Sequence, residues 1–237
     1  MDGVHVRAHS CMEKIKFKLS KRLRAAAELV RDGAYIADIG TDHAYLPVAL
    51  CLEGRARGAV ASDINEGPIS HAREHINKYG LSGKIDAILA DGLCAAEPYA
   101  PDDILILGMG GELIADILSR VEFIKNEKIR LILQPMTHAE AVRAFLCENG
   151  YAIVDEVLVR DDKIYQIICA EYTGETESYT DVELLLGRKN IERGGELFFE
   201  TVERFKGVFS QRMQGKKKAM EDTSEEEKML RALEELK

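Results

Sequence analysis

Three aspartates stand at the ends of short apolar runs in the first half of the chain. Asp38, Asp63 and Asp91 each close a strand-like run, at intervals of roughly 25 to 30 residues, as successive strand–helix units require. The carboxyl ends of parallel strands meet at one edge of an open α/β sheet, so these carboxylates are expected around one crevice. Carboxylates there accept hydrogen bonds from ribose hydroxyls and exocyclic amines. The pattern predicts a nucleoside-containing cofactor, although each aspartate alone also fits a strand-end turn.

The turn after the first run discriminates between kinds of cofactor. Gly40 lets the backbone pass close to a ligand, and it is the only glycine present of the G-x-G-x-x-G series that seats a pyrophosphate. Asp42 adds negative charge where a diphosphate would be repelled. S-adenosylmethionine (SAM) has no phosphate and carries a cationic sulfonium and ammonium. The turn therefore favours SAM over a nicotinamide dinucleotide, with a tight turn and an Asp helix cap as the structural alternative.

The second and third runs end in residues suited to the nucleoside part of that cofactor. Asp63, followed by Ile64, is expected to accept hydrogen bonds from both ribose hydroxyls. Asp91 is expected to accept from the adenine amine, with Gly92 leaving room for the ring. The alternatives are a helix N-cap for Asp63 and a plain turn for Asp91.

Glycines dominate the end of the fourth run. Gly108, Met109 and Gly110 are predicted to line the cofactor and to form a flat opening where a substrate base approaches the methyl group. Adenine N6-methyltransferases usually carry an Asn/Asp-Pro-Pro-aromatic motif here, and its absence disfavours N6 chemistry. A glycine turn without a ligand is the alternative.

Several polar side chains complete the candidate site. Gln134, at the end of the fifth run, offers a donor and an acceptor to a base edge, and His43 is a candidate acid–base group. His138 also falls near a strand end, and Tyr165 could stack on a base, although a core position is favoured for the tyrosine. Each of these residues also has a purely structural interpretation.

The elements that must position these residues follow from alternating apolar and amphipathic segments. Strands are predicted at residues 35–39, 58–62, 85–89, 103–107, 130–133, 152–158 and 164–171, and helices at 20–30, 45–53, 66–79, 111–119 and 137–148. Ser20 is a suitable N-cap for the first helix, and Gly150 follows the last one. Only a four-residue turn joins the final two strands, which predicts an antiparallel hairpin. Seven strands of this kind describe the Rossmann-like sheet of a class I methyltransferase.

The chain changes character near residue 174. Residues 177–237 are rich in Glu, Lys, Leu and Arg with apolar residues at helical spacing, which predicts a helical hairpin or coiled coil. Gly215 and residues 222–224 mark the expected turn, and residues 225–237 the returning helix. We therefore predict a basic extension at 1–18, a SAM-binding domain at 19–174 and a helical domain at 175–237.

Composition limits the class of protein. With 237 residues, 46% hydrophobic and 31% charged, the chain fits an ordinary soluble globular protein without a membrane span or secretory signal. Five scattered cysteines indicate reduced, buried thiols in a cytoplasmic protein and no zinc site. No metal is expected.

The net charge of −9 argues at first against a nucleic-acid partner, but net charge is an average over the chain and local patches of positive charge decide binding. Lys18, Lys21, Arg22 and Arg24 cluster near the N-terminus and are predicted to contact RNA phosphates. A solvated helix face is the alternative interpretation of this cluster.

Four segments resemble the bacterial tRNA (adenine-N1)-methyltransferase family that modifies position 22 of tRNA: residues 19–23, 37–47, 108–111 and 131–135. The string from Asp42 to Pro47 is the most distinctive of them. The resemblance covers about residues 19–172 and implies SAM as cofactor, tRNA as substrate, and a helical domain after the methyltransferase domain. It places Asp38 and Gly40 at the methionine end of SAM, although the generic class motif has glycines at positions 42 and 44.

Such chemistry needs little acid–base help. Neutral adenine N1 has a lone pair in the ring plane, so positioning is expected to dominate catalysis once the base is turned out of its stack. Asp42 is a candidate to stabilise the cationic product ring, Gln134 to hold the amine edge, and His43 to act as an acid–base group.

Three rival functions stay open. They are a methyltransferase of a small molecule or protein, a non-catalytic RNA-binding protein that keeps the SAM fold, and, least favoured, a nicotinamide oxidoreductase. The sequence does not decide the oligomeric state, nor whether the C-terminal helices bind RNA or a second subunit.

Overall fold

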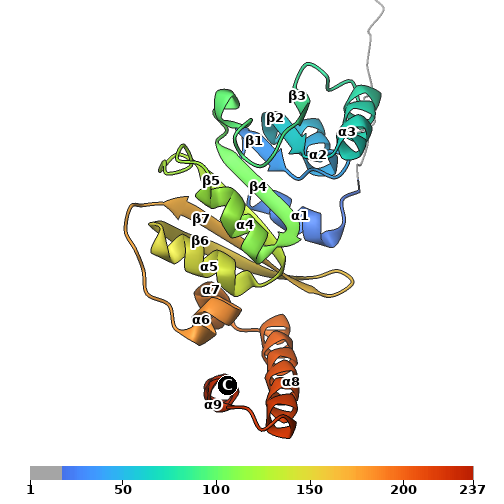
Figure 1. The fold of residues 1–237 in the computed structure, drawn as a ribbon. Helices are drawn as coiled ribbons and strands as arrows, with labels where there is room; N and C mark the ends of the chain where they lie inside the picture. The colour runs from blue at the N-terminus through green and yellow to red at the C-terminus, as the bar shows by residue number, and fades with distance from the viewer. Residues whose placement is uncertain (1–17, 237) are drawn as a thin grey trace, which may run out of the picture.

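The computed structural model describes residues 18–236. A seven-stranded sheet in the order β3-β2-β1-β4-β5-β7-β6 forms its centre (Figure 1). The strands are β1 (Ala34–Ile39), β2 (Ala56–Asp63), β3 (Ile85–Leu89), β4 (Asp103–Gly110), β5 (Arg130–Thr137), β6 (Tyr151–Arg160) and β7 (Ile164–Tyr172). Strand β7 runs antiparallel to both of its neighbours, and the strands from β3 to β5 are parallel. The predicted Rossmann-like sheet and its terminal hairpin are confirmed.

Helices cover both faces of this sheet. They are α1 (Lys21–Glu28), α2 (Tyr45–Leu52), α3 (Glu66–Lys78), α4 (Gly111–Ser119) and α5 (Ala139–Glu148), with a 3₁₀ turn, η1, at Glu97–Tyr99. Helices α1, α2 and α3 pack into one apolar core with Ile36, and α4 and α5 into another with Ala37. Neighbouring residues of β1 thus point to opposite faces, as the pleat of a strand requires. Because helices bury both faces of the sheet, most side chains in the middle of the central strands are apolar.

Local signals set the ends of several elements. Ser20 caps α1 by accepting a hydrogen bond from the Leu23 amide at 3.2 Å, and Gly150 adopts φ +80° after α5; both were predicted. Helix α5 begins two residues later than predicted, because residue 137 still belongs to β5 and His138 takes a left-handed conformation of φ 51°. The predicted burial of all cysteines is wrong for Cys94, which is exposed, whereas Cys51, Cys147 and Cys169 are buried. The fifth, Cys11, lies outside the described residues.

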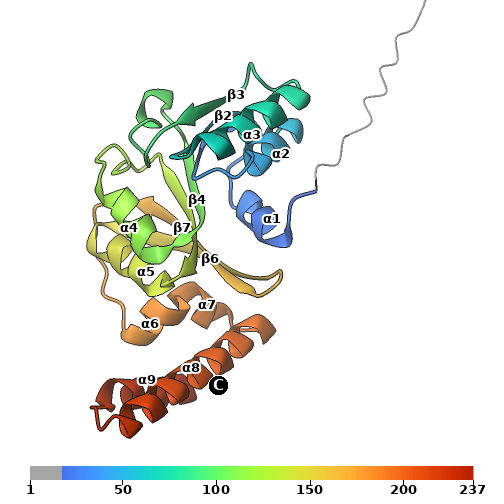
Figure 2. The same cartoon turned by 45° about the vertical axis from the view of Figure 1, so that its right-hand side comes forward.

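The C-terminal segment forms α6 (Asp181–Leu186), α7 (Arg188–Arg193), α8 (Glu196–Lys218) and α9 (Ser224–Glu234). Helices α8 and α9 lie side by side and fold back on each other (Figure 2), as the helical-hairpin prediction required. The turn falls at residues 219–223 alone. Gly215 lies inside α8, because its flanking residues favour helix and an exposed helical glycine costs only about 1 kcal/mol.

A fully buried ion pair joins these helices to the sheet domain. The Arg143 guanidinium donates to Glu156 Oε1 at 2.7 Å, to Gln166 Oε1 at 2.7 Å and to the Leu184 carbonyl at 2.8 Å at the end of α6. The other Glu156 oxygen accepts from the Lys189 amide in the first turn of α7 at 3.0 Å. A buried pair is tolerated because its polar atoms are hydrogen-bonded in this way.

Within residues 18–236, no helix combines the length and apolarity that crossing a bilayer requires. The same part of the chain holds no group of three or more His, Cys, Asp or Glu side chains arranged to bind a metal ion.

Candidate functional site

The Asp38 carboxylate lies buried at the end of β1. Its Oδ2 accepts a hydrogen bond from the Thr41 hydroxyl at 2.6 Å, and the Thr41 oxygen accepts from the Ala44 amide at 3.2 Å. Burial raises the pKa of Asp38 to about 6, with a smaller contribution from Asp42, against the lowering effect of the Thr41 hydrogen bond. Gly40 follows with φ +73°, a conformation that favours glycine. A buried carboxylate that resists ionisation is well suited to a cationic ligand group.

Asp42 and His43, by contrast, stand at the surface of the same turn. The Asp42 side chain is 81% exposed, and its Oδ1 lies 3.1 Å from His43 Nε2. The His43 ring stacks on His71 with centroids 4.7 Å apart and on Tyr45 at 5.1 Å. Both predicted residues thus border the strand ends from the solvent side.

Asp63 ends β2 and is partly buried. Its Oδ1 accepts from the Asn65 backbone amide at 2.8 Å and from the Asn65 side-chain amide at 3.1 Å, which fixes the carboxylate at the strand end. Ile64 beside it is 63% exposed, and Leu89 at the end of β3 is 52% exposed. The carboxylate is therefore flanked by apolar surface able to cover an aromatic ring.

Asp91 follows β3 and is exposed. Its Oδ2 accepts from Arg120 at 3.3 Å, in an ion pair whose side chains are both about half exposed or more and which contributes little stability. The strand end is tied to its neighbour because the Ala90 amide donates to the Asp63 carbonyl at 2.9 Å. Gly92 adopts φ +62° against Ile117 of α4. The pairing and hydrogen bonding of β1, β2 and β3 bring the three predicted carboxylates to one sheet edge.

The glycine-rich end of β4 adjoins the Asp38 turn. Gly108 has φ +82°, and the register with β5 shifts between Leu107 and Met109. The Met109 methyl group occupies the space that a Cβ on Gly40 would need, so the Met109 side chain packs directly on the Gly40 backbone. The predicted cofactor turn and the predicted base-facing floor are thus in direct contact.

Gln134 lies at the centre of β5 and is fully buried. Its Oε1 accepts a hydrogen bond from Arg22 Nη1 at 2.6 Å, and its Nε2 donates to the Pro135 carbonyl at 2.8 Å. The Arg22 guanidinium sits 5.5 Å from the centroid of the Tyr165 ring and next to Gly108. The amide that was expected to face a base faces Arg22 instead.

The other predicted RNA contacts separate into two groups. Lys18 and Lys21 are exposed at the start of α1. Arg24 forms a bidentate pair with Glu53, at 2.7 and 2.8 Å, and this hydrogen bonding raises the pKa of Arg24 and lowers that of Glu53. Arg22 points inward to the strand ends, away from the surface cluster in which it was placed.

The sequence offered one unused signal for Arg22. It stands four residues before Ala26, which is fully buried, and residues four apart share a face of a helix. That spacing turns Arg22 toward the sheet.

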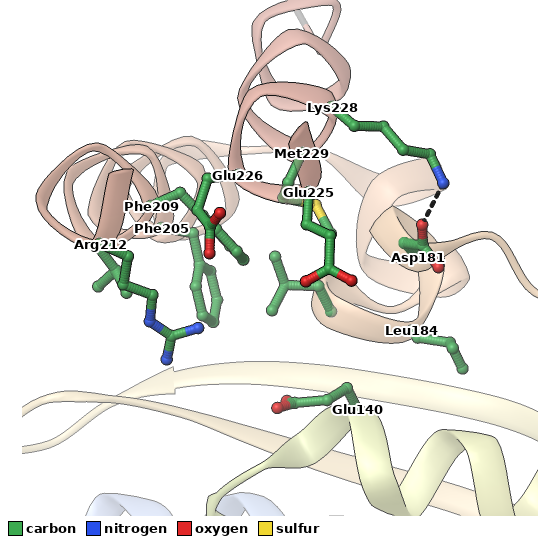
Figure 3. Close-up of a pocket in the computed structure, with 12 residues that line it drawn as sticks. Glu140, Asp181, Leu184, Phe205, Phe209, Arg212, Glu225, Glu226, Lys228 and Met229 are labelled. Atoms are coloured by element: carbon green, nitrogen blue, oxygen red, sulfur yellow. Dashed lines mark hydrogen bonds and ion pairs between the residues drawn. The ribbon is translucent and has the colours of Figure 1, made fainter. Parts of the chain in front are cut away.

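Tyr165 is buried, as the favoured interpretation held, and its hydroxyl donates to Asp162 at 2.6 Å, which raises the pKa of the tyrosine. It lines a groove of about 290 Å³ together with His138, Lys163 and two arginines of α8. A larger cavity, about 450 Å³, lies between α8, α9 and α6 (Figure 3). Asp181 and Glu225 line it, and none of Asp38, Asp63, Asp91 or Gly108 does, so the larger cavity is not the predicted site.

Comparison with known proteins agrees with this geometry. The family described as "Methyltransferase domain" matches residues 19–168. The tRNA (adenine(22)-N(1))-methyltransferase of Bacillus subtilis is 42% identical over 173 residues, which cover 73% of each chain. The solved structure of the B. subtilis enzyme, TrmK, superimposes with a TM-score of 0.78 at 34% identity, over 92% of this chain and 95% of the other.

A second solved structure comes from Streptococcus pneumoniae, a putative tRNA (m1A22) methyltransferase in complex with SAM. It superimposes with a TM-score of 0.79 at 29% identity, over 92% of this chain and 99% of the other. Both the sheet domain and the C-terminal helices fall within such coverage. This chain therefore belongs to the tRNA (adenine(22)-N(1))-methyltransferase family, the TrmK-like group of class I SAM-dependent methyltransferases.

Proposed function

We propose that this protein transfers a methyl group from SAM to N1 of the adenine at position 22 of tRNA, in the cytoplasm. The observation that carries the proposal is the meeting of Asp38, Asp63 and Asp91 at one sheet edge beside the Gly108–Gly110 floor. Family membership supplies the substrate, because the B. subtilis relative is named for adenine 22 of tRNA.

The residues at the sheet edge fit SAM. Asp38 is a buried carboxylate that forms no ion pair within residues 18–236, and a ligand ammonium would supply the missing charge. Asp63 is held where it can accept from ribose hydroxyls, and the exposed Ile64 offers an apolar face to an adenine ring. Asp91 and Gly92 border the same place from β3. When bound, SAM supplies a methyl group on a cationic sulfonium.

The protein's own contribution is mainly orientation. Adenine N1 needs no base, so holding the ring on the glycine floor in line with the methyl group supplies most of the rate enhancement. Met109, a residue of this floor, packs on Gly40 and so joins the floor to the Asp38 turn. We expect Asp42, which is exposed and paired with His43, to stabilise the positive charge that the ring acquires. Gln134 acts through Arg22 and is a positioning residue.

We also propose the domain division at residues 174/175. Helices α6 and α7 contact α5 and β6 and carry the Arg143–Glu156 pair, which supports their role as the bridge to α8 and α9.

A labelling experiment tests the proposed function. Unmodified tRNA and a variant with guanine at position 22 are incubated with SAM tritiated in its methyl group, and the labelled nucleoside is identified after digestion. We expect 1-methyladenosine from the first RNA and no label in the second. Label at adenine N6, or equal label in both RNAs, would reject the assignment. Cofactor binding without any transfer would favour the non-catalytic RNA-binding alternative.

A further inference from the structure

Within residues 18–236, Arg22 differs from most arginines because its guanidinium forms no ion pair with Asp or Glu, and the nearby Asp161 carboxylate is bound by the Arg22 backbone amide. Most arginines within residues 18–236 form ion pairs with Asp or Glu. The arginines of this part of the chain without such a pair are Arg22, Arg204, Arg212 and Arg231. Three of these four border Tyr165: Arg22 from α1, and Arg204 and Arg212 across the groove from α8. Arginines therefore lie on both sides of Tyr165, and of these Arg212 also borders the acidic cavity that contains Glu225 and Glu226.

Two contacts hold the Arg22 guanidinium in position, and a third holds the Arg22 backbone. Gln134 of β5 accepts from Nη1 at 2.6 Å, and the Tyr165 ring of β7 lies 5.5 Å away. The Arg22 backbone amide donates to Asp161 in the turn of the β6–β7 hairpin at 3.2 Å. Gln134 is neutral, so it orients the guanidinium without cancelling its charge. A half-buried cation held by a neutral amide is prepared for an anion from outside the chain.

The reaction itself indicates which anion this is. Methylation at N1 makes the adenine ring a cation, so a guanidinium hydrogen-bonded to the ring would oppose the transfer. A phosphate beside the ring has the opposite effect, because it neutralises Arg22 and keeps the flat guanidinium away from the product charge. Guanidinium groups bind phosphate through two parallel hydrogen bonds, and Arg22 has donors beyond the one used by Gln134.

We infer that Arg22 binds a phosphate group flanking the target adenosine, with Gln134 and Tyr165 as its positioning residues. This inference rests on the proposed function and assigns one contact within it. Bound there, next to Gly108, the phosphate fixes the flipped nucleotide at the edge of the glycine floor.

The groove beyond Tyr165 supports this path for the RNA. Lys163 Nζ lies 5.2 Å from the Tyr165 centroid on the hairpin turn, and the hairpin tip lies between α1 and α8 (Figure 2). Arg160 near that tip is paired with Glu200 of α8. The hairpin therefore connects Arg22 on one side with Arg204 and Arg212 on the other.

The test combines protein and RNA changes. Arg22→Gln removes the charge, and a tRNA carrying a neutral methylphosphonate on the 5′ or the 3′ side of the target adenosine removes the anion. For the wild-type enzyme, one of the two neutral RNAs should lose roughly ten- to hundredfold in kcat/KM and in binding affinity. The Arg22→Gln enzyme should show the same loss on ordinary tRNA and no further loss on that neutral RNA.

Three controls isolate the contact. Arg57→Gln removes another arginine that lies over a tyrosine, 5.7 Å from the centroid of the Tyr35 ring. This pair lies near the starts of β1 and β2, at the end of the strands opposite to the candidate site, so the variant should match the wild type in tRNA binding and in kcat/KM. Gln134→Glu places a carboxylate next to Arg22, so it should weaken RNA binding while the protein stays folded. Calorimetric titration with SAM should give wild-type affinity for Arg22→Gln, which shows an intact fold and an intact cofactor site.

Several outcomes would overturn the inference. The first is that Arg22→Gln and the neutral phosphate lower kcat/KM additively, and the second is that Arg22→Gln leaves kcat/KM unchanged. The third is that kcat/KM falls only when adenine N7 is replaced by carbon, which would assign Arg22 to the base. Each requires a wild-type enzyme that methylates tRNA. If the wild type transfers no methyl group to tRNA, the proposed function fails instead.

Discussion

The two halves of the functional sheet edge carry opposite charge. Asp38 and Asp63 lie at the ends of β1 and β2, and Asp91 follows β3. In contrast, glycines end β4, and α1 places Arg22 against the buried amide of Gln134 within β5. A cationic cofactor and a polyanionic substrate require this distribution. The comparison teaches that a net charge of −9 does not by itself argue against an RNA substrate, because the placement of individual cations differs from the average charge.

Each half also holds one charge in an unusual state. Asp38 is buried with only a hydroxyl donor on its side chain, and Arg22 is held by a neutral amide. In both places the protein leaves the counter-charge to its ligand. Ligand binding is then favoured by the charge that folding left uncompensated.

The largest expected effect is on SAM binding, and it comes from removing a negative charge at the ends of β1, β2 and β3, which form the cofactor half of the edge. Asp38→Asn should weaken SAM binding by roughly a hundredfold, because a buried charge-assisted contact is lost while the Thr41 hydrogen bond can persist. Calorimetric titration measures this, and RNA affinity should stay near the wild-type value. An unchanged SAM affinity would remove Asp38 from the cofactor site.

Acidification should affect the same half next most strongly. The pKa of Asp38 lies at about 6 in the free protein, so the carboxylate is mostly ionised at pH 7 and mostly protonated at pH 5. Since a cation binds the ionised form, SAM affinity should fall roughly tenfold between pH 7 and pH 5 and level off above pH 7. Asp38→Asn should lack this dependence, and a pH profile shared by both proteins would contradict the assignment.

Substitutions of the arginines in the groove beside Tyr165 should have smaller effects, and these effects should fall on tRNA binding. Arg204→Gln and Arg212→Gln should each weaken tRNA binding about three- to tenfold and reduce its dependence on salt, because each removes about one phosphate contact. Filter binding across a salt series measures both quantities. SAM affinity should not change, and a steep salt dependence of SAM binding would argue against the charge separation.

The smallest effect is expected at Arg24, which the sequence placed with Arg22. Its charge is satisfied by Glu53 at 2.7 and 2.8 Å, so Arg24→Gln should alter tRNA affinity by no more than about twofold. The same binding assay tests this. A loss as large as that of Arg22→Gln would mean that the whole N-terminal face of α1 contacts RNA.

Sequence patterns predicted the cofactor half of this edge better than the substrate half. Asp38, Asp63 and Asp91 each follow a strand within a repeated unit, so local periodicity was enough to bring them together. The contact between Arg22 and Gln134 joins residues 112 positions apart and depends on how α1 packs, which local patterns do not encode. Likewise, Gly215 resembled a turn because propensity alone does not include the packing of α8 against α9.

The joint between the sheet domain and its helical arm has a consequence for how the arm is aimed. Gly187, at φ +90° between α6 and α7, has no room for a side chain because the Glu156 carboxylate fills that space. Hydrogen bonds to Arg143 and Glu156 are directional, so the joint favours one orientation of α6 and α7 on the sheet domain. The seating of the helical arm on the sheet domain thus depends on three residues, Arg143, Glu156 and Gly187, that lie far from the three aspartates in sequence.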